Sequence, residues 1–223
     1  MSNKASSIHI KKLAAVAMFC ALAFVLTYVK IPVMFLSLEV KDAVIVLCTL
    51  LFGPISGLVI AVLVPFLEMV THSSTGVYGF LMNVLSSVTF SMVTGLIYKY
   101  KKTFYGAIVG LVSGVFAVTA VMVLANLLIT PYYMGAPVQT VVALIPKILL
   151  PFNFLKATLN GALVLLLYKP LSRVLKRTGF LEGEISSETK KPAAKNSLRS
   201  VIVTVIAAMI IVASLAIIFF VLK

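Results

Sequence analysis

Between Phe104 and Thr130 the chain reads FYGAIVGLVSGVFAVTAVMVLANLLIT, twenty-seven residues without a charged side chain. An α-helix rises about 1.5 Å per residue, so about 20 apolar residues cross the hydrocarbon core of a bilayer. The stretch is therefore long enough to span a membrane. Because lipid offers no hydrogen-bond partner to the backbone, such a run must satisfy its own peptide groups as a helix.

The composition of the whole chain points the same way. Hydrophobic residues make up 61% of the 223 residues and charged residues only 11%, whereas a soluble domain has about 25% charged residues. So few charges cannot cover an apolar surface, which excludes soluble enzymes, disordered regulators and disulfide scaffolds. The apolar runs are continuous rather than alternating, which argues against membrane β-strands. The sequence thus predicts an all-α integral membrane protein.

The same length rule finds seven apolar runs, at 13–30, 43–52, 54–71, 77–98, 104–130, 146–168 and 201–222. The second run is short, and a Gly-Pro pair separates it from the third. A charged stretch without apolar periodicity precedes the last run and is typical of a solvated linker. We expect three parts: a six-span unit at 1–172, a basic cytoplasmic linker at 173–200 and an additional C-terminal transmembrane helix at 201–223.

The net charge of +13 comes from 19 basic and 6 acidic residues, and its placement indicates topology rather than nucleic-acid binding. Short loops on the cytoplasmic side of a membrane protein are enriched in lysine and arginine. With the N-terminus inside, all but five of the basic residues fall on the inner side; the five are Lys30, Lys41, Lys147, Lys156 and Lys223. We therefore expect a multi-pass protein of the cell membrane with a cytoplasmic N-terminus and an extracellular C-terminus.

Small residues repeat every four positions on two of the runs. Gly106, Gly110 and Gly114 do so on the fifth run, and Ala17 and Ala21 on the first. Residues four apart share a helix face, and small ones let a second helix approach closely. For the glycines we predict packing inside the bundle. For the alanines, internal packing and contact with a partner protein are both open.

Two runs carry polar residues at helical spacing: Asn83, Ser87, Ser91 and Thr94 on the fourth, and Asn153, Lys156 and Asn160 on the sixth. On the fourth run, hydrogen bonds between helices are the simpler interpretation. Lys156 lies inside a span, which costs free energy unless its ammonium faces a cavity or a partner. Counting residues from the span ends places Asn126 and Glu68 in the same outer half as Asn153. These positions predict a pocket that opens outward.

Prolines predict broken helix ends near the same pocket. Pro131 closes the fifth run, and Pro146 and Pro151 interrupt the start of the sixth, where each removes a backbone donor.

The chain has no GxxxxGK[ST] phosphate loop, so we do not expect it to hydrolyse ATP. Glu68 and His72 are four residues apart but lack a third metal ligand or a nucleophile nearby in the sequence, so no enzymatic activity is expected.

Several stretches together resemble a known family. They are LFGPISG at 51–57, the segment 68–83, NLLITPYYMG at 126–135 and LPFNFLK at 150–156, of which the last two are the most specific. Through them, residues 8–172 resemble the substrate-binding S components of energy-coupling-factor (ECF) vitamin transporters. The resemblance is strongest to the riboflavin-specific, RibU-like branch of that family.

The resemblance implies a six-helix bundle with a vitamin site near its outer surface, to which this chain adds one helix of unassigned function. It implies riboflavin as the transported substrate and no cofactor or metal. The residues that it places against the flavin are Asn126, Asn153 and Lys156, together with Thr130, Glu39 and Asn83.

The resemblance also implies partners. Ala17 and Ala21 match the small-residue motif with which the family docks on a transmembrane coupling subunit. Two ABC-type ATPases of the same ECF module would supply the energy that this chain lacks. The S component would then reorient in the membrane and carry the vitamin inward.

One stretch departs from the family pattern. Residues 39–44 read EVKDAV, where the family often has an acidic-aromatic-Ser-Asp stretch followed by proline, so the form of the ligand, riboflavin or its phosphate FMN, stays open. An S component for another vitamin is an alternative, although the asparagine and lysine set favours riboflavin. A membrane-bound sensor or assembly protein is another, but a sensor is expected to carry a soluble output domain, and residues 173–199 are too short and too polar to form one.

Overall fold

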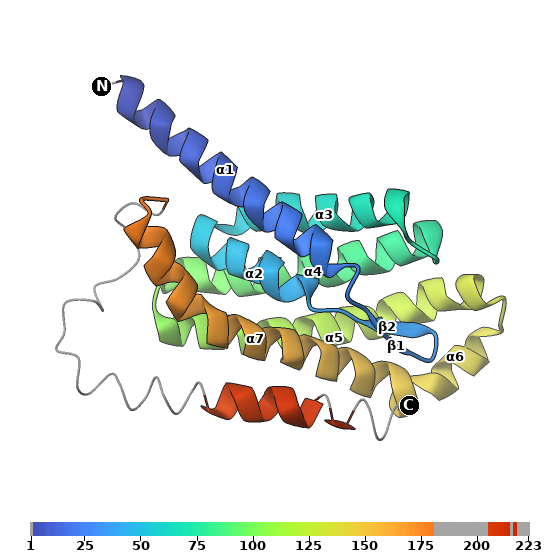
Figure 1. Ribbon diagram of the computed structural model, residues 1–223. Coiled ribbons are helices and arrows are strands. Elements are labelled where there is room, and N and C mark those ends of the chain that lie inside the picture. The colour runs from blue at the N-terminus through green and yellow to red at the C-terminus, as the bar shows by residue number, and fades with distance from the viewer. Residues whose placement is uncertain (1, 181–204, 215, 218–223) are drawn as a thin grey trace.

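The computed structural model describes residues 2–180, 205–214 and 216–217. Its helices are α1 (Ser2–Leu26), α2 (Lys41–Phe52), α3 (Pro54–Thr71), α4 (Gly76–Tyr100), α5 (Phe104–Met134), α6 (Val138–Leu144) and α7 (Leu150–Arg177). A π-helical turn, η1 (Ile145–Leu149), joins α6 to α7. All twelve residues of α2 are buried, and Figure 1 shows this short helix enclosed by its longer neighbours. The bundle is therefore built around α2.

The apolar runs predicted from the second to the sixth all lie in helices. Within the part of the chain that the structure describes, four helical segments are long and apolar enough to cross a membrane: α3, α4, α5 and the continuous segment Val138–Arg177. The first run was expected to extend to residue 30, but α1 ends at Leu26. The last run is described as helical over 205–214. Of the predicted linker, residues beyond 180 and before 201 lie outside the described residues.

The predicted break at Pro131 is absent, whereas at Pro146 the regular α-helix gives way to a π-turn, after which α7 begins with Pro151 in its first turn. Pro131 lies inside α5, which continues to Met134. At Pro146 the chain stays helical through η1, where the backbone N–H of Leu150 donates to the Ile145 carbonyl oxygen. The wider π-turn avoids the clash between a proline ring and the preceding turn. Helical structure thus continues past both prolines.

A β-hairpin follows α1 and was not predicted. Strands β1 (Ile31–Val33) and β2 (Leu36–Leu38) pair antiparallel, with Val33 opposite Leu36. The two-residue turn between them places Met34 at φ 55°, a conformation that non-glycine residues adopt uncommonly. Three-residue strands are too short to leave a readable alternation in the sequence, so the all-α prediction missed them.

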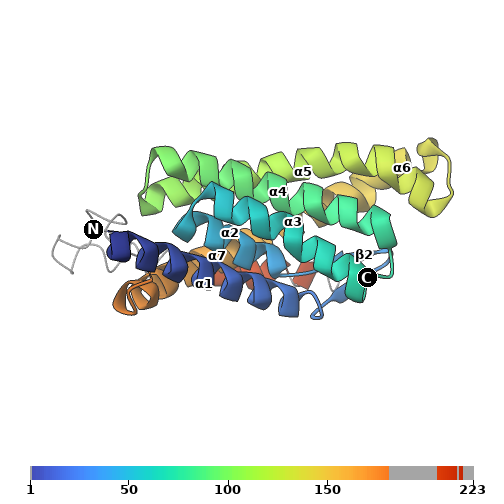
Figure 2. The ribbon, with the colours of Figure 1, turned by 90° about the horizontal axis from the view of Figure 1, so that it is seen from above.

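The predicted glycine packing is confirmed between α4 and α5. A Cβ at Gly110 would lie 2.8 Å from the Thr94 carbonyl oxygen, and one at Gly114 would lie 2.5 Å from Thr94 Oγ1. Thr94 Oγ1 also donates to the Gly110 carbonyl oxygen over 3.2 Å. Only glycine allows this close approach. Figure 2 shows α5 along one side of the bundle and α1 along the other.

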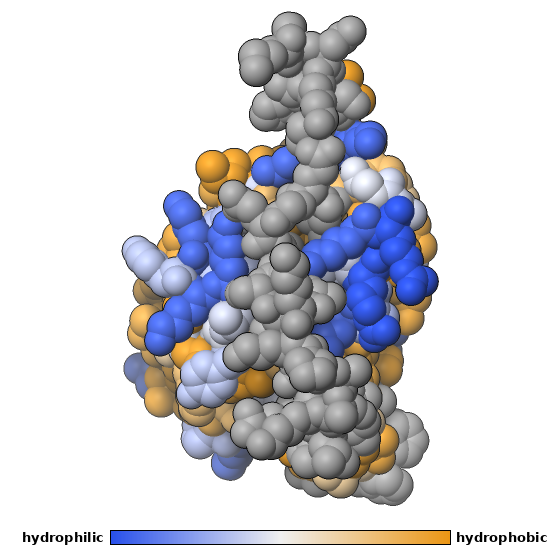
Figure 3. Space-filling model, turned by 90° about the vertical axis from the view of Figure 1, so that its left-hand side faces the viewer, coloured by the Kyte–Doolittle hydropathy of each residue, from blue (hydrophilic) through white to orange (hydrophobic). Residues whose placement is uncertain are grey.

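Hydrophilic side chains gather at the end shown in Figure 3, where the turn between α4 and α5 and the end of α7 lie. Lys101, Lys102 and Arg177 are exposed there. The hairpin lies toward the opposite end. This grouping agrees with the count of basic residues by loop, while the orientation in the membrane stays a prediction.

Candidate functional site

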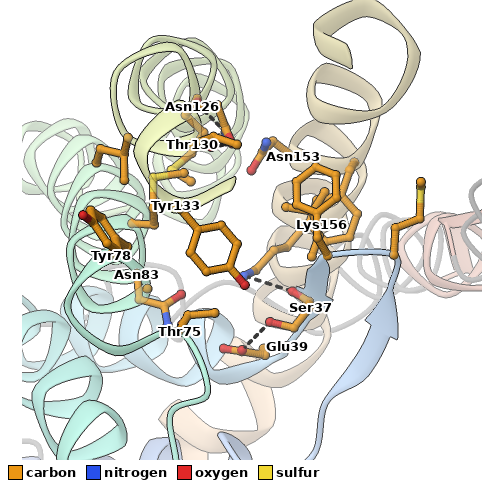
Figure 4. Close-up of a pocket in the computed structure, with 18 of the residues that line it drawn as sticks. Ser37, Glu39, Thr75, Tyr78, Asn83, Asn126, Thr130, Tyr133, Asn153 and Lys156 are labelled. Atoms are coloured by element: carbon orange, nitrogen blue, oxygen red, sulfur yellow. Dashed lines mark hydrogen bonds between the residues drawn. The ribbon is translucent and has the colours of Figure 1, made fainter. Parts of the chain in front are cut away.

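A pocket of about 410 Å³ lies beside the hairpin and is lined by residues of the hairpin, α3, α4, α5 and α7. Figure 4 shows side chains from the hairpin, α4, α5 and α7 converging on it. The structure brings all six sequence-predicted ligand contacts into its lining: Glu39 after β2, Asn83 on α4, Asn126 and Thr130 on α5, and Asn153 and Lys156 on α7. Residues separated by more than a hundred positions thus share one cavity.

The two most buried asparagines of the wall are each held by the backbone carbonyl four residues earlier. Asn126 Nδ2 donates to the Met122 carbonyl oxygen (2.6 Å), and Asn126 Oδ1 accepts from Thr130 Oγ1 (2.9 Å). Asn153 Nδ2 donates to the Leu149 carbonyl oxygen over 2.7 Å. A carboxamide has two N–H donors and an oxygen with two lone pairs. These bonds orient both amides and leave capacity for a bound molecule.

Lys156 connects α7 to the hairpin. Its ammonium lies 3.5 Å from the Ser37 carbonyl oxygen, to which it donates, while Ser37 Oγ donates to Glu39 Oε1 over 2.8 Å. Asn160, one turn further along α7, is fully buried outside the pocket lining. Its amide donates to the Glu39 carbonyl oxygen (3.0 Å) and accepts from the Ala43 N–H (2.8 Å). Asn160 therefore fixes the path of the chain, and Lys156 faces the pocket.

An ion-pair network at the base of the hairpin was not predicted. Lys41 is fully buried and pairs with Glu39 and with Glu68, its Nζ lying 2.6 Å from Glu68 Oε2. Lys30 also pairs with both carboxylates, at 3.6 Å from Glu39 Oε1 and in direct contact with Glu68. Asn83 Nδ2 donates to Glu68 Oε2 over 3.1 Å. The network ties both ends of the hairpin to α3 and α4.

The surrounding lysines control the charge of Glu39, which lies in the loop after β2. Burial by itself would raise the pKa of Glu39. The ammonium groups of Lys156, Lys41 and Lys30 outweigh the burial and lower this pKa from 4.5 to about 2. Glu39 is therefore ionised throughout the physiological pH range and acts as a hydrogen-bond acceptor only.

The sequence carried a signal for this network. Three of the chain's six acidic residues, Glu39, Asp42 and Glu68, lie within thirty positions of one another in an otherwise acid-free unit. Lys30 and Lys41 are two of the five basic residues that do not fall on the predicted inner side. Buried charges in an apolar protein have to be paired. The sequence therefore indicates that these three acidic residues and two lysines need partners, but not which of them pair.

Other polar residues have structural partners. Ser87 Oγ donates to Asp42 Oδ1 over 2.5 Å, which confirms hydrogen bonding between helices for the polar stripe on α4. His72 stacks on Tyr28, with ring centroids 4.0 Å apart, and its Nε2 lies 3.2 Å from Thr27 Oγ1. Glu68 pairs with lysines instead of His72. Among the described residues no group of three or more His, Cys, Asp or Glu side chains is placed to hold a metal ion.

Aromatic and apolar side chains complete the pocket wall. Tyr78 on α4 and Tyr133 on α5 line it with their ring centroids 6.4 Å apart. Phe152 and the hairpin residue Leu36 line it from the side of α7 and β2. Ligand pockets combine such apolar walls with a few oriented polar groups. This pocket suits a molecule with flat apolar faces and an edge rich in donors and acceptors.

Ala17 and Ala21 lie elsewhere, on the exposed face of α1. The opposite face of α1 is buried through Ala15, Phe19 and Ala23. The exposed alanines therefore do not pack inside the described bundle, which leaves them free to contact a partner.

Comparison with known proteins adds a family to this geometry. Residues 11–168 match the family model described as "ECF transporter, substrate-specific component". The chain is similar to the riboflavin transporter RibU of Staphylococcus aureus (strain TCH60), with 29% identity over 75% of this chain and 93% of that protein. It is also similar to the riboflavin transporter FmnP of Bacillus subtilis (strain 168), with 28% identity over 72% and 93%.

One solved structure has the same fold. It is described as "Structure and mechanism of the S component of a bacterial ECF transporter" and superposes with a TM-score of 0.66 at 30% identity. The match covers 76% of this chain and 99% of that chain.

Proposed function

Because this chain belongs to the family of substrate-specific components of ECF transporters, we propose that it binds riboflavin and confers specificity for vitamin B2 uptake. The observation that carries the proposal is the convergence of Asn126, Asn153 and Lys156 on one pocket. Two relatives that share more than a quarter of their residues with this chain are riboflavin transporters, which supports the same substrate.

The chemistry of a flavin suits this pocket. Its pyrimidine edge alternates donors and acceptors, which the carboxamides of Asn126 and Asn153 can match, and the Lys156 ammonium favours carbonyl oxygens. The ribityl hydroxyls need further acceptors and donors, which Glu39 and Asn83 offer beside the hairpin. Tyrosine and phenylalanine rings in the wall would cover the faces of the isoalloxazine ring.

The energy for uptake would come from partner proteins. In this proposal the chain is not an enzyme and uses no cofactor, and riboflavin is its substrate. Ala17 and Ala21 dock α1 on a transmembrane coupling subunit, because their exposed small side chains let another helix approach closely. Two ABC ATPases complete the module, and the hairpin end of the bundle faces the cell exterior.

Riboflavin titration of the purified full-length protein tests the proposal. The chain has no tryptophan, so the fluorescence of the flavin itself is the probe, and we expect its quenching with submicromolar affinity. Asn153→Ala and Lys156→Ala should each weaken binding by at least about tenfold, because each loses a charged or amide hydrogen bond. Lys147→Ala, at an exposed lysine outside the pocket, is the matched control.

The outcomes are distinct. Absence of submicromolar riboflavin binding by the folded wild-type protein would contradict the proposed function. If both Asn153→Ala and Lys156→Ala bind riboflavin normally, riboflavin remains the proposed substrate, but these two residues do not form its binding site. FMN, which adds a phosphate to the same ring system, is the second candidate because Lys30 and Lys156 both line the pocket. Competition between riboflavin and FMN for the protein shows which of the two binds more tightly.

A further inference from the structure

The C-terminal helix at 205–214 presents one face to the bundle. Ala207 and Ser214 are buried, with 1% and 3% of their surface exposed, and Ile211 between them is partly buried. Val205, Met209 and Val212 are exposed. Spacings of four and three residues place the buried positions along one stripe of a helix. Figure 1 shows this helix, in red, lying along α7.

Ile211 reaches the back of the pocket wall. It packs against a buried apolar cluster formed by Val33 and Leu38 of the hairpin and Phe152 and Leu159 of α7. Phe152 also lines the pocket, and so does Leu36, which packs against the same cluster. Ile211 therefore packs against a cluster that includes a residue of the pocket wall.

The hairpin depends on such packing. Its strands have three residues each, and an isolated two-stranded hairpin is at best marginally stable in water. The ion pairs of Lys30 and Glu39 hold its two ends, and Lys156 contacts Ser37. The apolar side of the hairpin rests on the cluster to which α7 and the C-terminal helix contribute.

This helix lies beyond residue 168, where the match to the family model ends. We propose that the C-terminal helix is a positioning element of the ligand pocket: Ile211 backs Phe152 and the hairpin and thereby slows release of the bound flavin. The inference rests on the proposed function for its ligand. Ile211 acts through the cluster and does not touch the ligand itself.

Dissociation of riboflavin from the full-length protein tests this role. Protein in detergent is loaded with radiolabelled riboflavin and chased with an excess of unlabelled riboflavin. We expect Ile211→Ala to accelerate dissociation about tenfold, because it removes packing behind Phe152, with little change in the association rate. Val212→Ala makes a similar change at an exposed position of the same helix and should dissociate like the wild type.

A conservative variant separates positioning from general stability. Ile211→Leu keeps the side-chain volume and should restore slow dissociation. If Ile211→Ala does not fold, Ile211→Val removes a single methylene and should still raise the dissociation rate about twofold. The inference is overturned if folded Ile211→Ala, or Ile211→Val where Ile211→Ala does not fold, releases riboflavin at the rate of Val212→Ala, even if its unfolding temperature falls. Failure of the wild-type protein to bind riboflavin would instead overturn the proposed function.

Discussion

Replacement of Lys41 by methionine tests the buried ion-pair network most directly. Lys41 is fully buried, and the carboxylates that it pairs with, Glu39 and Glu68, have side chains only 1% and 4% exposed. Methionine keeps most of the length of the side chain and removes its charge. Two buried carboxylates would then share Lys30, whose side chain is 28% exposed. The variant thus leaves two buried carboxylates in contact with a single ammonium group.

The burial of the two carboxylates sets the expected loss of unfolding free energy in Lys41→Met. Removing one partner of a buried ion pair costs about 3–5 kcal/mol because the other partner stays buried and uncompensated. Lys30 still contacts both carboxylates, so we expect the lower end of this range, about 3 kcal/mol. That corresponds to about a hundredfold shift in the unfolding equilibrium. Riboflavin affinity should fall as well, because Glu39 lines the pocket.

Denaturant unfolding in detergent measures the effect, with Lys147→Met as the control at an exposed lysine. The double variant Lys41→Met, Glu68→Met should be more stable than Lys41→Met alone, because it replaces a buried pair with apolar groups. The reasoning is refuted if Lys41→Met unfolds like Lys147→Met, or if the two substitutions are simply additive.

Three further predictions concern other parts of the molecule. The folded-state pKa of Glu39, about 2, lies below its ordinary value of 4.5, so its stabilising contribution is complete above about pH 5 and is lost as the pH falls toward 2; Glu39→Gln should flatten this part of an unfolding-temperature profile measured against pH. Ala17→Leu with Ala21→Leu should leave riboflavin binding unchanged and reduce uptake by cells, because both side chains are exposed on α1; weakened binding would contradict the docking role. Gly110→Ala should destabilise the bundle by about 1–3 kcal/mol in denaturant unfolding, because its Cβ would meet the Thr94 carbonyl oxygen at 2.8 Å; Gly161→Ala, whose Cβ would make ordinary contacts at 3.8 Å, should be close to neutral.

Much of the helical architecture could be predicted from local pattern. Runs such as 54–71 and 104–130 are apolar over a membrane's thickness, and the backbone can satisfy its hydrogen bonds there only as a helix. The spacing of Gly106, Gly110 and Gly114 likewise predicts a close helix contact, although it does not identify α4 as the neighbouring helix. The gathering of Asn126, Asn153 and Lys156 in one pocket was expected because polar groups in an apolar chain avoid lipid by facing a shared cavity.

Three features were decided only by the tertiary structure. The hairpin at 31–38 has strands too short for a periodic signal, and it is held by contacts with α7 and by the network of Lys30 and Glu39. Lys41 looks like a loop charge in the sequence, and only the folded chain brings Glu68 to it across twenty-seven positions. Ile211 looks like any residue of an apolar span until packing places it against the cluster that includes Phe152. Hydrophobicity and spacing along the chain therefore determine which segments are helices, because those depend on near neighbours. Which charges pair and which surfaces touch depend on residues far apart in the chain, and only packing brings those together.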